Sequence, residues 1–143
     1  LGAAGKITSS FDVARLLTLG ADWCNAARGF MFALGCIQAQ SCHTGQCPTG
    51  VTTQDKRRGQ ALHVPSKADR VFNFHQETLH ALKDLLQAAG LDSPQSLTAS
   101  HIQRRLAANS ALPLAQIYPT LGEGMLLQTD QRTQWPEPFK SLW

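Results

Sequence analysis

Long hydrophobic runs are absent from this sequence of 143 residues. Gly, Asn, Arg or Gln interrupts every apolar run well before the roughly 18 residues that a membrane-spanning helix needs, so no transmembrane span is expected. The first residues have neither the basic segment nor the apolar core of a signal peptide, so a cytoplasmic location is expected. The chain also lacks internal repeats and low-complexity tracts, and its 43% hydrophobic content predicts a folded protein.

Charge is also scarce, at 16% of the residues, against roughly 25% in an ordinary soluble domain. This shortage indicates that protein or cofactor covers part of the surface. A net charge of +3 is small for a nucleic-acid binder, which argues against that class. Residues 1–65 carry six positive and three negative charges, whereas residues 66–143 carry seven of each. A bound anion, such as a phosphate, is therefore expected near the first half.

Cysteine is absent from the 96 residues that begin at Pro48, and all four cysteines precede it: Cys24, Cys36, Cys42 and Cys47. A secreted disulfide scaffold spreads its cysteines along the chain, so this clustering argues against one. Metal or redox chemistry in a reducing compartment is favoured instead. Cys24 lies in an apolar stretch and is interpreted as a small core residue.

Hydrophobic periodicity predicts helices over residues 10–19, 30–40, 66–89 and 97–106, and a strand over residues 21–26. Ser9 or Ser10 would cap the first helix, and Ser66 to Asp69 would form the capping box of the third. A short helix that leads into a strand is half of a βαβ unit, and its first strand is expected to be missing from this chain. The lack of periodicity in residues 41–65 predicts a functional loop. Residues 107–143 are expected to form a tail that packs on another surface.

Three thiols lie within twelve residues in the pattern Cys36-x5-Cys42-x4-Cys47-Pro48. A polar loop that contains glycine can turn all three toward one centre. Structural zinc sites prefer Cys-x2-Cys pairs, which are absent here, whereas iron–sulfur sites accept wider spacings and often place Pro after a ligand. An iron–sulfur cluster is therefore favoured. It would contain either three irons, or four irons of which one is labile. Buried free cysteines or a redox disulfide are the alternatives.

Two short segments rich in Gly and Ala each precede a predicted helix: residues 2–6 (GAAGK) and residues 26–29 (AARG). Small residues let the backbone approach an anion closely, and Lys6 and Arg28 could add charge. The loops after the seventh and eighth strands of (β/α)8 barrels commonly bind phosphate in this way. Ordinary turns are the alternative interpretation.

Two weaker features lie in the predicted loop. His43 stands beside Cys42 and is interpreted as a polar loop residue rather than a ligand. The run Lys56-Arg57-Arg58 is interpreted as a solvated or interface charge run, with steering of an acidic electron donor as a further possibility.

Residues 2–55 contain, in order, GAD, a run into ALGC, then C-x5-C-x4-CPTG and TQD. Together these motifs resemble the C-terminal end of the FMN-binding domain of glutamate synthases, above all the FMN-binding glutamate synthase family proteins. The similarity extends to about Leu127. It implies an α/β fold, a (β/α)8 TIM-type barrel that holds FMN at its C-terminal mouth beside a 3Fe-4S cluster.

A complete barrel needs roughly 250 residues, so the resemblance implies a fragment whose barrel continues upstream. Residues 1–55 would form the end of the barrel with the iron–sulfur cysteine loop. Residues 56–143 would form a mostly helical C-terminal extension that packs on it. The chain by itself is therefore expected to be mainly α with few strands, and inactive alone.

Carried over position by position, the resemblance assigns the cluster ligands to Cys36, Cys42 and Cys47. It places Gly5, with Lys6 beside it, in one loop that holds the FMN phosphate. The second such loop comprises Ala26, Ala27, Arg28 and Gly29. No catalytic residue is assigned.

The implied reaction is an oxidoreductase step of glutamate biosynthesis and nitrogen metabolism. Electrons pass between the 3Fe-4S cluster and FMN and reach 2-iminoglutarate, formed from 2-oxoglutarate and glutamine-derived or free ammonia, to give L-glutamate. Ferredoxin or a reductase subunit is the implied electron donor. Two alternatives stay open: an interaction module stabilised by an iron–sulfur cluster or zinc, and a flavin oxidoreductase with a different acceptor.

Overall fold

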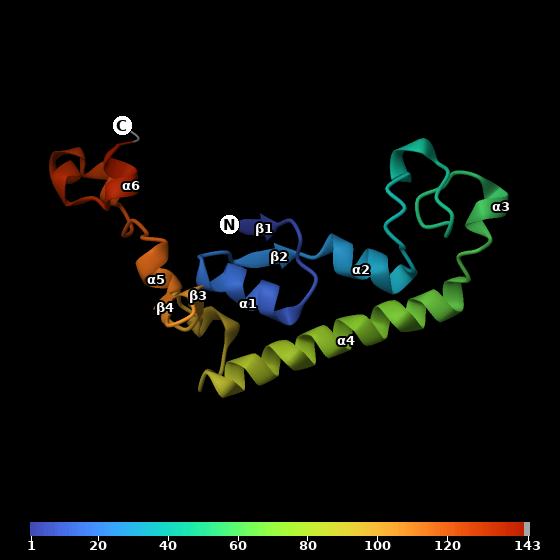
Figure 1. Cartoon of the computed structure of the whole chain (residues 1–143), viewed down its shortest axis with the longest axis horizontal. Coiled ribbons are helices and arrows are strands. Elements are labelled where there is room, and N and C mark those ends of the chain that lie inside the picture. The colour runs from blue at the N-terminus through green and yellow to red at the C-terminus, as the bar shows by residue number, and fades with distance from the viewer. Residues whose placement is uncertain (142–143) are drawn as a thin grey trace. The chain divides into compact units, whose positions relative to one another are not determined.

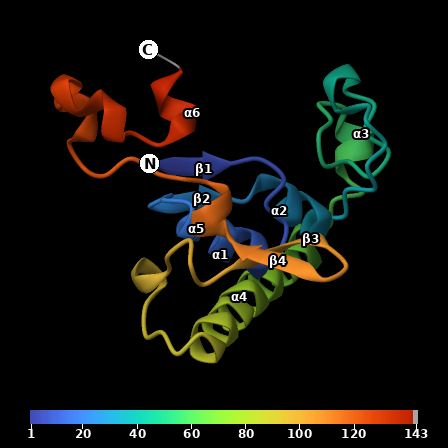
Figure 2. The same ribbon diagram turned by 60° about the vertical axis from the view of Figure 1, so that its left-hand side comes forward.

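The computed structural model describes residues 1–141, the side chains of residues 129–131 excepted. The chain divides into two compact units, Leu1–Leu97 and Thr98–Trp143 (Figures 1 and 2). The first unit extends beyond residue 55 because the long helix that follows packs on the elements before it. Within the described part of the chain, no helix has both the length and the apolar character to cross a membrane.

The first unit begins with a parallel βαβ arrangement. Its elements are β1 (Gly2–Ala4), α1 (Ser10–Thr18), β2 (Trp23–Asn25), α2 (Ala27–Leu34), η1 (Cys42–Thr44), α3 (Lys56–Gly59), α4 (Val64–Ala88) and η2 (Pro94–Ser96). β1 pairs with β2 in parallel, and Ala4 lies opposite Asn25. The expectation that the first strand is missing is therefore wrong. Residues 2–4 form it, and because all three are small they show no hydrophobic alternation from which a strand could be predicted.

Helix α1 begins as the sequence predicts, with Ser9 as its N-cap. The Ser9 hydroxyl accepts a hydrogen bond from the Asp12 N–H at 3.2 Å, and the Asp12 carboxylate accepts one from the Ser9 N–H at 3.1 Å. Hydrogen bonds from the Thr8 N–H and the Ser9 hydroxyl lower the pKa of Asp12. This capping box fixes the point at which the chain leaves the turn after β1.

Helix α2 begins and ends earlier than the predicted helix over residues 30–40. It ends at Gly35, whose φ of +105° is left-handed. The Gly35 N–H donates to the Phe32 carbonyl at 2.9 Å and the Cys36 N–H to the Met31 carbonyl at 3.0 Å, which is the Schellman arrangement. The periodicity extends the helix too far because Ile37 and Ala39 continue the apolar pattern beyond the glycine.

Helix α4 is the longest element and packs on both α1 and α2 (Figure 1). The capping box predicted at Ser66–Asp69 is wrong, because the helix already begins at Val64 with His63 as its N-cap. Pro65 in the first turn favours this earlier start. The Ser66 hydroxyl donates to the His63 carbonyl at 3.1 Å instead of capping.

The second unit contains a hairpin where the sequence predicts a helix over residues 97–106. Its elements are β3 (Gln103–Ala107), β4 (Ser110–Pro113), α5 (Leu114–Ile117), η3 (Met125–Leu127), η4 (Thr129–Gln134) and α6 (Glu137–Lys140). β3 and β4 are antiparallel, with an irregularity between Arg105 and Ala107. The few apolar residues of this stretch are too widely spaced to define a helical face. Leu114 and Trp135 are buried, so the predicted tail has buried residues of its own.

Gly29 allows α2 to approach α4 closely. A Cβ at this position would lie 2.7 Å from Cζ of Phe74, whose ring meets Phe30 edge-on at a centroid distance of 5.1 Å. We therefore expect Gly29→Ala to lower the free energy of unfolding by about 1–3 kcal/mol, as overpacked cores do, measured by urea unfolding of the full-length protein.

Gly59→Ala is the matched control, because a Cβ there meets nothing within 4 Å. It should leave stability unchanged or slightly higher. Adding Phe74→Leu to Gly29→Ala should recover part of the loss, since the smaller side chain frees the space. Equal losses from the two alanine variants would contradict this account of the packing.

Candidate functional site

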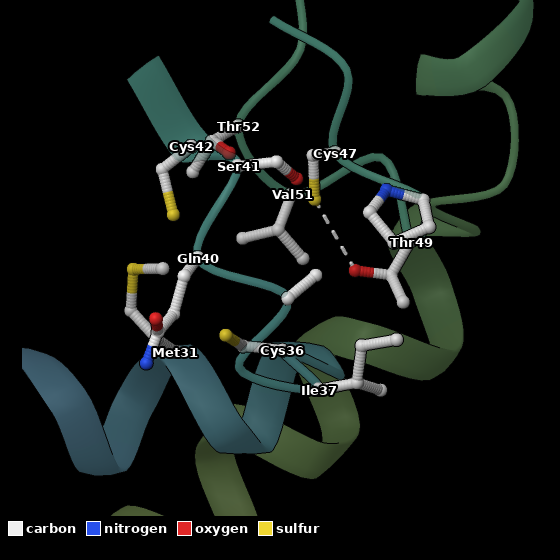
Figure 3. A pocket seen from close by; sticks show the side chains of 12 residues that line it. Met31, Cys36, Ile37, Gln40, Ser41, Cys42, Cys47, Thr49, Val51 and Thr52 are labelled. Atoms are coloured by element: carbon white, nitrogen blue, oxygen red, sulfur yellow. Dashed lines mark hydrogen bonds between the residues drawn. The ribbon is translucent and has the colours of Figure 1, made fainter. Parts of the chain in front are cut away.

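The three cysteines of the predicted ligand set line one pocket. Cys36 lies two residues beyond the end of α2, Cys42 begins η1, and Cys47 lies in the turn beyond it. Figure 3 shows their sulfur atoms on different sides of this pocket, with the Val51 side chain between them. Cys24 is on β2 and does not line the pocket. The fold thus gathers the three thiols that the sequence pattern grouped and leaves out the fourth.

Left-handed backbone turns the cysteine loop back on itself. Gln38 and Gln40, between the first two cysteines, have φ values of +57° and +56°. Gly45 and Gly50, on either side of Cys47, have φ values of +73° and +76°. Left-handed conformations are uncommon for residues other than glycine and often occur at functional sites. The sequence analysis did not predict the left-handed backbone of the two glutamines, because a glutamine side chain gives no indication of this conformation.

Cys47 is held in surroundings that favour its thiolate. Its sulfur is buried and lies 3.4 Å from the Thr49 hydroxyl (Figure 3). Hydrogen bonds from that hydroxyl and from the Thr52 backbone N–H lower the pKa of Cys47 to about 6. In contrast, burial raises the pKa of Cys24. Because the thiolate is the form that binds metals, the loop already stabilises one thiol in its ligand form.

Three thiols at one pocket are the donor type that iron–sulfur clusters use. Among residues 1–141, the side chains of residues 129–131 excepted, no three His, Cys, Asp or Glu side chains lie close enough to share one metal ion. The thiol pocket is nearly filled, with free space of about 10 Å³, close to that of one water molecule. The loop would have to open to admit the predicted cluster.

The buried Thr52 hydroxyl also lies at this pocket and makes no hydrogen bond of normal geometry in the described part of the chain. Its interaction with the Cys47 sulfur nevertheless contributes to the lowered pKa of Cys47. The Thr52 side chain thus favours a thiolate at Cys47 together with the Thr49 hydroxyl. Thr49 and Thr52 were not among the predicted site residues, although their position just after the Cys47-Pro48 pair was a usable signal.

A second cavity, of about 350 Å³, joins the thiols to the predicted phosphate loop. Its lining comprises Ala27, Arg28, Met31, Phe32, Cys36, Gln38, Gln40 and Cys42. Met31, Cys36, Gln40 and Cys42 line the thiol pocket as well. Two predicted cluster ligands and two predicted phosphate-loop residues therefore face the same space.

The two predicted phosphate loops lie at neighbouring strand ends. β1 and β2 run in parallel, so Gly5 and Lys6 emerge at the same edge of the sheet as Ala26. Gly5 and Lys6 are both left-handed, with φ values of +102° and +54°. Ala26 makes no side-chain cap of α2. Among the described residues, the first N–H groups of this helix have no recorded acceptor, and such groups bind anions in other proteins. The exposed Arg28 stands beside them.

Gly29 differs from the other members of the predicted loop. It is buried in α2, and its lack of a side chain is explained by the contact with Phe74 of α4. A backbone contact from Gly29 to phosphate stays a prediction.

His43 is exposed and lines neither cavity, in line with its interpretation as a loop residue.

Residues 1–92 match the conserved region in glutamate synthase, which is well over half of the chain. The chain belongs to the glutamate synthase family, and the resemblance seen in its motifs is confirmed. It is 43% identical over 103 residues to the glutamate synthase large subunit-like protein YerD of Bacillus subtilis, which covers 72% of this chain and 20% of that protein.

Two further relatives carry the names of complete enzymes. The archaeal glutamate synthase (NADPH) of Methanocaldococcus jannaschii is 37% identical over 103 residues, 72% of this chain and 20% of the relative. The ferredoxin-dependent glutamate synthase 2 of Synechocystis is 36% identical over 93 residues, 64% of this chain and 6% of the relative. The chain thus spans a fifth of the length of these relatives or less.

The Thr49 hydroxyl should control the ionisation of Cys47. In the metal-free protein, we expect the ultraviolet absorbance of this thiolate, taken as the difference from Cys47→Ser, to rise with a midpoint near pH 6. Thr49→Val removes the largest stabilising hydrogen bond, so the midpoint should move to higher pH. Thr78→Val on α4 is the control, since that hydroxyl donates to the Phe74 carbonyl. An unchanged midpoint in Thr49→Val would exclude this role.

Proposed function

We propose that the protein that carries this chain makes L-glutamate by reducing 2-iminoglutarate, formed from 2-oxoglutarate and glutamine-derived or free ammonia. The chain would provide the ligands of a 3Fe-4S cluster and part of an FMN phosphate site. One observation carries the proposal: Cys36, Cys42 and Arg28 line one cavity. Membership of the glutamate synthase family supports the reaction.

Each side chain has a distinct part in this proposal. Cys36, Cys42 and Cys47 would each bind one iron, and Cys47 is already favoured as the thiolate. Arg28 and the free N–H groups at the start of α2 would bind the phosphate of FMN. When bound, the cluster supplies single-electron transfer and FMN supplies hydride transfer.

The cavity arrangement supports electron transfer between the two groups. Met31 and Gln40 line the thiol pocket and the larger cavity together with the two shared cysteines. Groups held in these spaces would be neighbours, separated by few side chains. Val51 lies between the three sulfurs in Figure 3 and would have to turn aside when the loop opens.

Substrate-binding parts of the barrel would come from elsewhere in the protein. Among the described residues, β2 pairs with β1 alone. Beside β2 lies a groove of about 770 Å³ with a mainly apolar lining that includes Trp23, Leu17 and Leu79. Trp23 is 58% exposed. A neighbouring strand of the proposed barrel would cover these side chains, which is consistent with the low charge content of the sequence.

An acidic electron donor, such as ferredoxin or a reductase subunit, would dock beside the thiols. The three cations of α3 are exposed, and the Asp55 carboxylate caps this helix through the N–H groups of Arg57 and Arg58. Arg58 also contacts the cysteine loop, because its Nη1 lies 3.4 Å from the carbonyl oxygen of Gln46. Complementary charge steers encounter and fixes orientation.

The cluster proposal predicts different outcomes for two cysteine variants. The full-length protein purified anaerobically should contain iron, inorganic sulfide and FMN, and show the paramagnetic signal of an oxidised three-iron cluster. Cys42→Ser should lose iron because a ligand is removed, whereas Cys24→Ser should keep it. Stoichiometric zinc without iron would instead support a metal-stabilised interaction module, and equal loss from both variants would show that the ligand assignment is wrong.

The reaction itself is tested by glutamate formation. The protein should convert 2-oxoglutarate to L-glutamate with a chemical reductant, and supplying glutamine or ammonia in separate assays identifies the nitrogen source. A protein that contains both cofactors but forms no glutamate with either source would point to a flavin oxidoreductase with another acceptor.

The cations of α3 should affect binding of the electron donor and not the reduction step itself. In the double variant Lys56→Ser with Arg57→Ser, we expect the KM for an acidic donor such as ferredoxin to rise several-fold and to depend less on salt. Turnover with a small chemical reductant should stay unchanged. Arg70→Ser with Lys83→Ser removes the same charge from exposed positions of α4. Equal effects from both double variants would contradict a local docking site.

A further inference from the structure

Lys67 of α4 reaches across to the end of α2. A Cβ built on Gly35 would lie 2.9 Å from the Nζ atom of Lys67 and 3.9 Å from its Cε. The lysine ammonium therefore sits directly against the residue that precedes Cys36. Two features favour glycine at position 35. Its φ is +105°, and a side chain there would displace the ammonium.

The end of α2 offers a reason for this placement. Its last carbonyl groups form the negative end of the helix dipole. The carbonyls of Met31 and Phe32 accept hydrogen bonds from Cys36 and Gly35. In the described part of the chain, no backbone N–H donates to the carbonyls of Ala33 and Leu34. A cation next to Gly35 is favourable for these groups.

Lys67 also makes no ion pair with any of the side chains that the structure describes. It is half-buried, and its ammonium has no acidic partner within residues 1–128 and 132–141. Its nearest acidic neighbour along α4 is Asp69, which is exposed and makes no ion pair with it. A half-buried cation with no acidic partner is available to offset negative charge that arrives later, and Cys36 is the adjoining residue.

We propose that Lys67 is the positioning residue of the thiol site: it holds the last turn of α2, and hence Cys36, and it offsets the negative charge that collects there. The second part rests on the proposed function, since the thiolates of a bound cluster bring that charge. Without Lys67, the cluster would meet the negative end of α2 directly.

Metal-free protein tests the positioning role on its own. Lys67→Met keeps the length of the side chain and removes the charge, and Lys83→Met removes the same charge from an exposed site on the same helix. We expect hydrogen exchange at the Gly35 and Cys36 amides to become about two- to fivefold faster in Lys67→Met, the factor that a charge at a helix end contributes. Lys83→Met should match the wild type, and Lys67→Arg should restore slow exchange.

Redox titration of the iron-loaded protein tests the charge role. Loss of a nearby cation disfavours the added electron, so the midpoint potential of the cluster should become more negative in Lys67→Met. It should return toward the wild-type value in Lys67→Arg and stay unchanged in Lys83→Met. A merely structural role would not move the potential of a cluster that is fully loaded.

The two measurements separate the two proposals. A wild-type protein that binds no iron overturns the proposed function, while the exchange rates still decide the positioning role. Equal exchange in Lys67→Met and Lys83→Met overturns the positioning role. Equal potentials in these two variants, with the cluster present, overturn the charge role.

Discussion

The close packing of α2 on α4 is the contact on which the rest of the first unit depends. Gly29 brings the two helices together at Phe74, and Phe30 meets the same ring edge-on at 5.1 Å. α4 also packs on α1, so one long helix fixes the βαβ arrangement and the element that leads into the cysteines. If α2 moved, the predicted phosphate loop at its start and Cys36 just beyond its end would move with it.

The proposed cluster site combines a firmly held helix with a loop that would have to open to admit the cluster. Cys36 is fixed by the Schellman end of α2, whereas Cys42 is exposed in η1 and Cys47 lies buried beyond it. The small free space between the thiols shows that side chains fill the pocket in this conformation. If the loop opened around left-handed residues such as Gln38, α2 would still hold Cys36 while Cys42 and Cys47 moved.

Local signals predicted the parts of this structure that local forces determine. The Ser9 cap of α1 and the end of α4 before Gly90 follow from cap chemistry, and the motif pattern grouped three cysteines that the structure brings to one pocket. Strand β1 was missed because only pairing with β2 makes residues 2–4 extended. The hairpin over residues 103–113 was missed because sparse apolar residues fit neither period clearly. The left-handed turn at Gln38 was missed because glutamine rarely adopts this conformation, whereas the contact between Thr49 and Cys47 is local and could have been predicted.

The direction of α2 explains why its two ends suit different charges. Eight residues span about 12 Å. Among the described residues, the first N–H groups of α2, beside Arg28, and its last carbonyls have no backbone partner. The first end would suit a phosphate, as an uncapped helix start does. The second end would repel the thiolates of a cluster unless a cation offset it, and the Lys67 ammonium lies next to Gly35 at that end. In the proposed site, one short helix would therefore serve two anionic groups because α4 supplies a positive charge at the end where the helix has none.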